Sequence, residues 1–135
     1  MPILAERGYL IPAIGEQYHA CAGQLAASIL NFHPDANITI LTKEMLPYGD
    51  LGGYANDWQC FYASPYRQTI KLEADMFCAG PIDHWWNLFE LRDVVVSQGA
   101  RDYYDQPATS RFYRKIFDEN NLPDVYNAIT YWRLS

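Results

Sequence analysis

The amino-acid sequence predicts a single domain of the α/β class, with a mostly parallel sheet flanked by helices. Two observations lead to this fold. The chain has 135 residues, of which 50% are hydrophobic and 19% are charged, and this is the size and composition of one ordinary globular domain. A strand pattern, a helix pattern and a second strand pattern follow one another within about 35 residues, and such units build parallel sheets with right-handed crossovers.

The first half of the chain supplies these three elements and a loop. Residues 9–14 form a short apolar run between two glycines, which predicts a buried strand. Residues 16–32 repeat apolar side chains at helical spacing, and residues 38–42 alternate as a second strand. Glycine and proline mark residues 43–54 as a loop, and residues 56–63 predict a short helix. Three aromatic side chains of this helix are expected to point inward: Trp58, Phe61 and Tyr62.

The second half predicts three more strands and two short helices. Residues 69–73 form a strand that ends in a carboxylate, and residues 93–98 are a β-branched run typical of an interior strand. Asp83 is placed to cap a short helix. Residues 110–118 predict another capped helix, and residues 125–132 predict the last strand.

The chain ends three residues after this last strand. A strand this apolar normally leads into a helix that covers one face of the sheet. The pattern therefore predicts a domain over residues 1–135 that is the front part of a larger protein, or a minimal version of a longer fold. An uncovered last strand would be protected by self-association, so a homo-oligomer is one expected state.

Composition excludes several classes of function. The net charge of −6 and the pI near 4.8 argue against a nucleic-acid-binding surface, because phosphate neutralisation needs a basic patch. The chain lacks an apolar run of about 18 residues that would predict a membrane span, and its N-terminus lacks the layout of a signal peptide. Three cysteines in apolar contexts predict buried free thiols in a reducing compartment, and no Cys or His spacing suggests zinc. We therefore expect an acidic cytoplasmic protein.

Glu73 and Asp75 are the main candidates for a functional site. In an extended chain, residues i and i+2 point to the same side, about 6.5–7 Å apart along the strand. Two carboxylates at this spacing repel each other unless a positive group lies between them, and together they bind one hard cation or one polar ligand. The alternative is a pair of solvated carboxylates at a strand end, with Lys71 or an arginine as partner.

Four segments resemble, in order, the motifs of one enzyme family. Residues 71–76, Lys-Leu-Glu-Ala-Asp-Met, look like Y-L-D-A-D-M/I, and residues 80–86, Gly-Pro-Ile-Asp-His-Trp-Trp, look like the G-D-I-D-x-L-W that follows it. Residues 126–129 resemble F-N-A-G, and residues 16–35 resemble a helix that ends in S-I-x-x-x-H-P-D-A. These motifs are similar to those of family-8 (glycogenin and galactosyltransferase-like) glycosyltransferases of the nucleotide-diphospho-sugar, or GT-A, fold. The resemblance spans residues 8–135 and implies the donor-binding half of a three-layer, Rossmann-like GT-A sheet.

The resemblance implies a metal-dependent hexosyltransferase that uses a nucleotide-sugar donor, such as a UDP-sugar, and an acceptor that the sequence does not name. Asp75 would bind a divalent cation directly, typically Mn²⁺ or else Mg²⁺. Glu73, in place of the usual first Asp, would contact the metal or the donor ribose. The cation would neutralise the diphosphate and stabilise the leaving group.

The same resemblance assigns further residues to the donor. Ala13, Ile14 and Tyr18 would line the nucleobase pocket, in agreement with the position of ligands at the carboxyl ends of strands in open α/β sheets. Arg67 would face donor phosphate or sugar hydroxyls, and Asn127 would hydrogen-bond the sugar. The alternatives are that Arg67 is an ordinary surface residue and that Asn127 bridges a loop.

A second hypothesis is a catalytically inactive GT-A-like module that serves binding or assembly. It is favoured by Ile129, which stands where the family has glycine, and by the family's acceptor-binding half, which has no counterpart in this sequence. The acidic pair and Asn127 favour the transferase. A phosphate-processing hydrolase is the weakest alternative, because the sequence has no P-loop or nucleophile motif.

Overall fold

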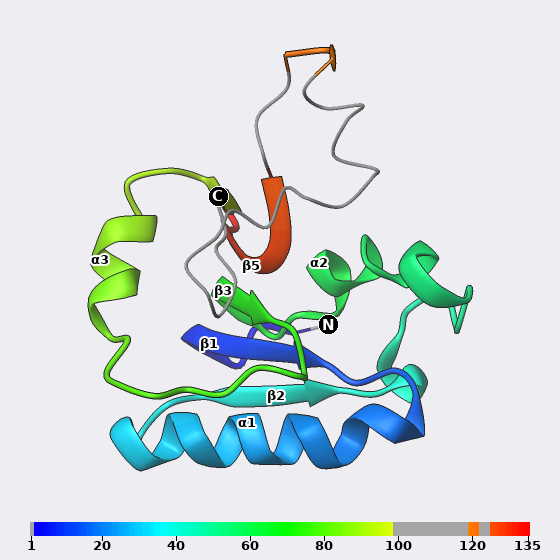
Figure 1. Ribbon diagram of the computed structural model, residues 1–135, viewed down its shortest axis with the longest axis horizontal. Coiled ribbons are helices and arrows are strands. Elements are labelled where there is room, and N and C mark those ends of the chain that lie inside the picture. The colour runs from blue at the N-terminus through cyan, green and yellow to red at the C-terminus, as the bar shows by residue number, and fades with distance from the viewer. Residues whose placement is uncertain (1, 99–118, 122–124) are drawn as a thin grey trace.

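Within the described residues, five strands form one sheet in the order β2-β1-β3-β5-β4. Of these, Figure 1 labels β1, β2, β3 and β5. The computed structural model describes residues 2–98, 119–121 and 125–135. β1 pairs in parallel with β2 and with β3, whereas β5 is antiparallel to β3 and to β4. The sheet is therefore mixed, and the prediction of a mostly parallel sheet holds only for β2, β1 and β3. The prediction of an interior strand at residues 93–98 was wrong, because β4 is the last strand in this order and its Val94 and Val96 are exposed. The strands are β1 (Ala5–Pro12), β2 (Ile38–Leu41), β3 (Tyr66–Leu72), β4 (Val94–Gln98) and β5 (Val125–Arg133).

Helices pack on both faces of this sheet. α1 (His19–Phe32) and α3 (His84–Phe89) contribute to one core cluster, and α2 (Gln59–Ala63) contributes to the cluster on the other face. None of the helices in the described ranges is long and apolar enough to cross a membrane. The described part of the chain also contains three short 3-10 turns: Glu16–Tyr18, Lys43–Met45 and Gly53–Asn56.

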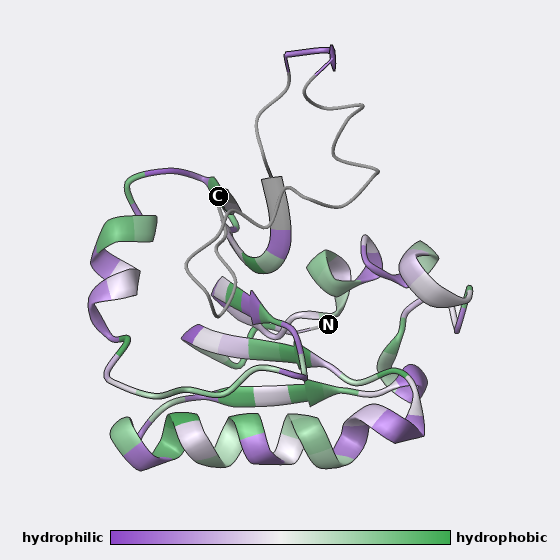
Figure 2. Ribbon diagram, in the orientation of Figure 1, coloured by the Kyte–Doolittle hydropathy of each residue, from purple (hydrophilic) through white to green (hydrophobic). Residues whose placement is uncertain are grey.

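Strict alternation along β1 builds the two core clusters. Tyr9 and Ile11 pack with Leu25 of α1, whereas Leu10 packs with Cys60 of α2. Successive side chains of a strand point to opposite faces, so a strand buried on both faces reads as a continuous apolar run. In Figure 2, β1 changes from hydrophilic at its start to hydrophobic towards its end. The apolar end of β1 therefore lies between both helical layers.

Several element boundaries differ from the prediction. α1 begins at His19 and not at residue 16, because a 3-10 turn precedes it. Asp83 occupies the N-cap position of α3, but its side chain makes no capping hydrogen bond. β3 ends at Leu72, so residues 74–75 form a turn and the acidic pair is not in an extended strand. The helix predicted over residues 110–118 lies outside the described residues.

The three aromatic residues predicted to face inward in the helix over residues 56–63 are exposed. Trp58, Phe61 and Tyr62 have exposed fractions of 48%, 42% and 55%. In a helix with 3.6 residues per turn, some residues next in sequence to the buried ones lie on the outer face. The prediction was wrong because the periodicity of a five-residue helix is too short to fix its inner face. The buried residues of α2 are Gln59, Cys60 and Ala63.

Candidate functional site

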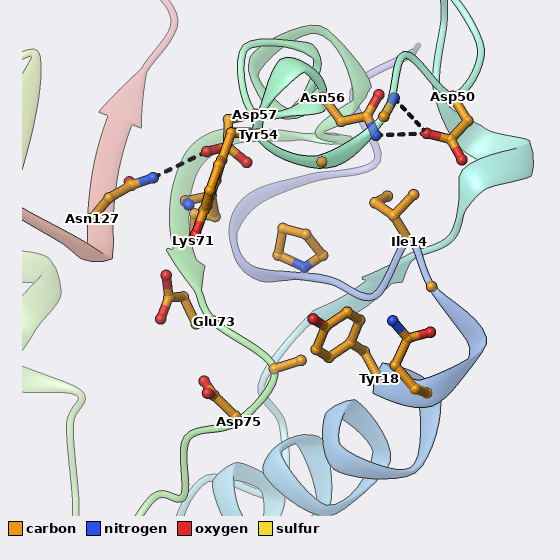
Figure 3. A pocket seen from close by; sticks show the side chains of 16 residues that line it. Ile14, Tyr18, Asp50, Tyr54, Asn56, Asp57, Lys71, Glu73, Asp75 and Asn127 are labelled. Atoms are coloured by element: carbon orange, nitrogen blue, oxygen red, sulfur yellow. Dashed lines mark hydrogen bonds between the residues drawn. The ribbon is translucent and has the colours of Figure 1, made fainter.

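A pocket of about 560 Å³ opens at the carboxyl ends of β1 and β3 (Figure 3). Its walls come from residues 12–18, residues 50–57, residues 71–75 and Asn127. Because β1 and β3 are parallel neighbours, their carboxyl ends meet at one edge of the sheet, which is where ligands bind in open α/β sheets. The charged side chains that line the pocket are Asp50, Asp57, Lys71, Glu73 and Asp75.

Glu73 and Asp75 reach this pocket from the turn that follows β3. The backbone N–H of Glu73 donates to the carbonyl of Ala128 at 3.3 Å, which fixes the start of the turn against β5. Glu73 is partly buried, whereas Asp75 is exposed. The turn therefore directs both carboxylates to one pocket, although not through the extended spacing that the sequence suggested.

The electrostatic environment of Glu73 disfavours its negative charge. Burial raises the pKa of the Glu73 carboxyl, because the ionised form loses hydration. The neighbouring carboxylate of Asp75 raises this pKa further, the ammonium of Lys71 lowers it, and Asp57 adds a smaller upward effect. A cation bound beside Glu73 and Asp75 would relieve the repulsion between them.

A loop before α2 forms the second wall of the pocket, and two buried amides hold it. Asn56 Oδ1 accepts hydrogen bonds from the Leu51 N–H at 2.8 Å and from Gln59 Nε2 at 3.1 Å. Gln59 also donates to the Gly49 carbonyl at 2.8 Å and accepts from the Tyr48 N–H at 2.9 Å. Asn56 is 4% exposed and Gln59 is fully buried. Neither residue was predicted from the sequence, because hydrogen bonds between side chains and backbone in a loop leave no periodic signal.

Asp50 belongs to the same loop and is engaged within it. Its Oδ1 accepts from Asn56 Nδ2 at 2.8 Å and from the Gly52 N–H at 2.9 Å. These two hydrogen bonds lower the pKa of Asp50, because they stabilise the ionised carboxylate. Gly52 and Gly53 have φ of 88° and 50°, a left-handed conformation that favours glycine. Asp50 therefore shapes the loop that lines the pocket.

Asp57 and Asn127 join this loop to β5 at one side of the pocket (Figure 3). Asn127 Nδ2 donates to Asp57 Oδ2 at 3.3 Å, and Thr130 Oγ1 donates to Asn127 Oδ1 at 3.1 Å. Asn127 was predicted as a site residue, and it lines the pocket. It also bridges a loop, which was the alternative role expected for it. Asp57 was not predicted, because a single carboxylate in a loop carries no motif.

Lys71 contributes a buried ammonium to the pocket. It is 6% exposed, and it pairs with Leu10 of β1 and with Thr130 of β5. On this face of the sheet it also acts electrostatically on Cys60. Burial raises the pKa of the Cys60 thiol to about 11 in spite of Lys71, so Cys60 is a neutral thiol and not a nucleophile.

The remaining predicted donor residues are only partly brought together. Ile14 and Tyr18 line the pocket, but Ala13 is fully buried in the apolar core on the α1 side. Ala13 points away because successive residues at the end of β1 alternate in direction. Arg67 lies near the amino end of β3, where its exposed side chain pairs with Glu6 at 3.4 Å. The structure therefore removes Ala13 and Arg67 from the candidate site.

The positions of Ile129 and Cys21 differ from those expected from the sequence. Ile129 pairs with Leu72 and packs against the core, and it does not line the pocket. It therefore does not narrow this pocket, although its position in the F-N-A-G-like segment had suggested that it would. All three cysteines were expected to be buried, but only Cys60 and Cys78 are, whereas Cys21 is exposed on α1.

The acidic pair fits a hard divalent cation, provided that the ligand completes the coordination. Carboxylate oxygens suit Mn²⁺ and Mg²⁺. Mg²⁺ is commonly held by one or two carboxylates together with substrate phosphates and water. Over the described ranges, no group of three or more His, Cys, Asp and Glu side chains is placed to hold a metal. A cation at Glu73 and Asp75 would therefore need oxygen ligands from a bound phosphate group.

Comparison with known proteins adds no family assignment. A scan against models of protein families gives no match. A search of curated proteins also gives no matching sequence. The function proposed below therefore depends on the residues of the pocket.

Proposed function

We propose that this chain is a metal-dependent glycosyltransferase, or the donor-binding half of one, and that its pocket binds a nucleotide-diphospho-sugar. One observation carries the proposal. Tyr18 after β1, Glu73 and Asp75 after β3, and Asn127 in β5 line the same pocket, although they are far apart in the sequence. These are positions to which the resemblance to family-8 transferases gives roles in donor binding.

The charge around the pocket supports binding of a diphosphate together with a cation. Four lining carboxylates and one ammonium give a formal charge of −3. A free diphosphate would be repelled by this charge, whereas its complex with a divalent cation would be repelled far less. Asp50 and Asp57 accept hydrogen bonds from the protein, but none from the described residues reaches the carboxylates of Glu73 or Asp75. The acidic pair is therefore the part of the pocket that remains open to a cation.

Different pocket residues bind different parts of the donor. Glu73 and Asp75 hold the cation, which when bound neutralises charge on the departing nucleoside diphosphate. Ile14 and Tyr18 offer an apolar side chain and an aromatic ring to the nucleobase. The amide of Asn127 bonds both Asp57 and Thr130 and offers hydrogen-bonding groups to the sugar.

Calorimetric titration tests the proposal directly. UDP and UDP-sugars are titrated into the protein with and without Mn²⁺, and release of UDP from each sugar donor is followed in parallel. We expect Mn²⁺ to strengthen UDP binding, and the affinity in the presence of Mn²⁺ to fall roughly 10-fold or more in Asp75→Asn, because loss of metal-site groups commonly costs that much. Asp35→Asn is the matched control, since Asp35 is an exposed carboxylate outside the pocket.

The titration distinguishes the transferase from the inactive binding module. UDP binding that is absent, or that is indifferent to Mn²⁺ and to Asp75→Asn, removes the transferase proposal. Metal-dependent binding of the UDP-sugar without any release of UDP favours the inactive binding module instead.

A further inference from the structure

Lys71 stands out because it is both charged and buried. Its side chain is 6% exposed, and no other Lys, Arg, Asp or Glu among the described residues is buried. Burial of a charge is costly unless an opposite charge or several hydrogen bonds compensate for it. The position of Lys71 in the pocket wall therefore requires an explanation beyond packing.

The strand geometry explains how the ammonium reaches the pocket. Lys71 is the penultimate residue of β3, beside Leu10 in β1 and Thr130 in β5. Leu10 is fully buried, so the aliphatic stem of Lys71 has an apolar neighbour in the sheet. Lysine commonly buries its stem along such a surface and extends its ammonium beyond it. In Figure 3 the side chain of Lys71 lies on the side of the pocket where Asp57 and Glu73 project.

The protein does not compensate this charge through direct ion pairs in the described part of the chain. Asp57, one of the two neighbouring carboxylates, accepts a hydrogen bond from Asn127 instead. The ammonium therefore faces the pocket from the sheet without a bonded carboxylate. The ion pairs in the described residues all use arginine: Arg7 with Glu90, Arg67 with Glu6, and Arg133 with Asp93.

We propose that Lys71 is a phosphate-binding residue whose ammonium contacts a phosphoryl oxygen of the bound nucleoside diphosphate without the help of a metal. This inference rests on the proposed function, because it concerns the same pocket and the same class of ligand. It separates two contributions to binding. Glu73 and Asp75 provide the contribution that depends on a divalent cation, and Lys71 provides the one that persists when the cation is removed.

The experiment measures UDP and uridine affinity in excess EDTA, by NMR titration of wild type, Lys71→Met and Lys71→Arg. Methionine preserves the length of the apolar stem without the charged ammonium, and arginine keeps the charge. We expect weak UDP binding by wild type, a loss of roughly 10- to 100-fold in Lys71→Met, as for a hydrogen bond to a charged group, and partial retention in Lys71→Arg. Uridine has no phosphate, so its affinity should be equal in all three proteins.

Arg67→Met is the matched control, because Arg67 is an exposed cation on the same strand and lies outside the pocket. The inference is overturned if wild type does not bind UDP in EDTA, or if Lys71→Met binds UDP as well as wild type does. An equal loss of UDP and uridine affinity also overturns it, since Lys71 would then act only through the shape of the pocket. If Lys71→Met does not fold, the UDP-to-uridine affinity ratio of Lys71→Arg decides. A changed ratio supports the phosphate contact, and an unchanged ratio overturns it.

Failure of the proposed function gives a different result. UDP binding that depends on Lys71 in EDTA, but gains nothing from Mn²⁺, removes the metal-dependent transferase and keeps the phosphate contact. Mn²⁺-dependent UDP binding that Lys71→Met leaves unchanged keeps the transferase and removes the phosphate contact.

Discussion

Asn127 Nδ2 donates a hydrogen bond to Asp57 Oδ2 at 3.3 Å, across 70 positions of the sequence. This bond links β5 to the loop before α2, and both residues line the same pocket. Asn127 is itself oriented by Thr130, which lies in the same strand. The sheet and the loop are therefore joined at one side of the pocket.

Replacement of Asn127 by a carboxylate should loosen the loop. In Asn127→Asp, two like charges would face each other, so we expect faster hydrogen exchange of the backbone amides of residues 50–57. The pair is exposed, so the free energy of unfolding should change by less than about 1 kcal/mol. Asn31→Asp on the exposed face of α1 is the control. Unchanged exchange rates in Asn127→Asp would show that Asn56 and Gln59 hold the loop without help from β5.

The buried amide of Asn56 should matter more for stability. Asn56→Ala leaves the Leu51 N–H without its acceptor and removes a contact of Gln59. We expect a loss of about 1–3 kcal/mol in urea unfolding, which is the cost of an unsatisfied buried polar group. Asn31→Ala on the exposed helix surface should be neutral or slightly stabilising, because alanine favours helix. Equal stability of Asn56→Ala and wild type would contradict the role of the amide.

Gly8 and Gly23 form a second matched pair. A Cβ at Gly8 in β1 would overlap the ring of Tyr66, whose hydroxyl is hydrogen-bonded to Thr39 at 2.6 Å. We expect Gly8→Ala to lose about 1–3 kcal/mol, as overpacked cores do. A Cβ at Gly23 in α1 would meet no atom within 4 Å, so Gly23→Ala should gain about 1 kcal/mol from helix propensity. Thermal unfolding of both variants checks the opposite signs.

The sequence was sufficient to predict the first three strands, the first helix and the position of the acidic pair. The apolar run at residues 9–14 and the alternation at residues 38–42 are local signals, and both became neighbouring parallel strands. The antiparallel direction of β5 was not predictable, because the residues of a strand do not determine which strand it pairs with or in which direction. Asp57 and the amides of Asn56 and Gln59 were missed for the same physical reason. Their role depends on contacts made in three dimensions, and the loop that holds them has no period.

Glu73 should make the stability of the protein depend on pH in a defined direction. Its folded-state pKa lies above the ordinary value of 4.5, because of burial and the nearby carboxylate of Asp75. Between these two pKa values the folded state binds more protons than the unfolded state, so stability falls as the pH rises. We therefore expect Glu73→Gln to be more stable than wild type at neutral pH, with a difference that disappears below pH 4.5.

Urea unfolding of wild type and Glu73→Gln across this pH range provides the measurement. The difference between the two proteins isolates Glu73 from the other carboxylates, which titrate in both. A difference that does not vary with pH would mean that the substitution acts through packing and not through charge.

The proposed function rests on the claim that Glu73 and Asp75 hold a divalent cation together with a diphosphate. Substoichiometric Mn²⁺ added to the UDP-bound, ¹⁵N-labelled protein tests it most directly, because Mn²⁺ broadens the NMR signals of nearby nuclei. We expect the amides of Glu73, Ala74 and Asp75 and the side-chain amide of Asn127 to broaden first, and Asp75→Asn to abolish the effect. Broadening that is spread over the acidic surface, or that is the same in Asp75→Asn, would contradict the claim.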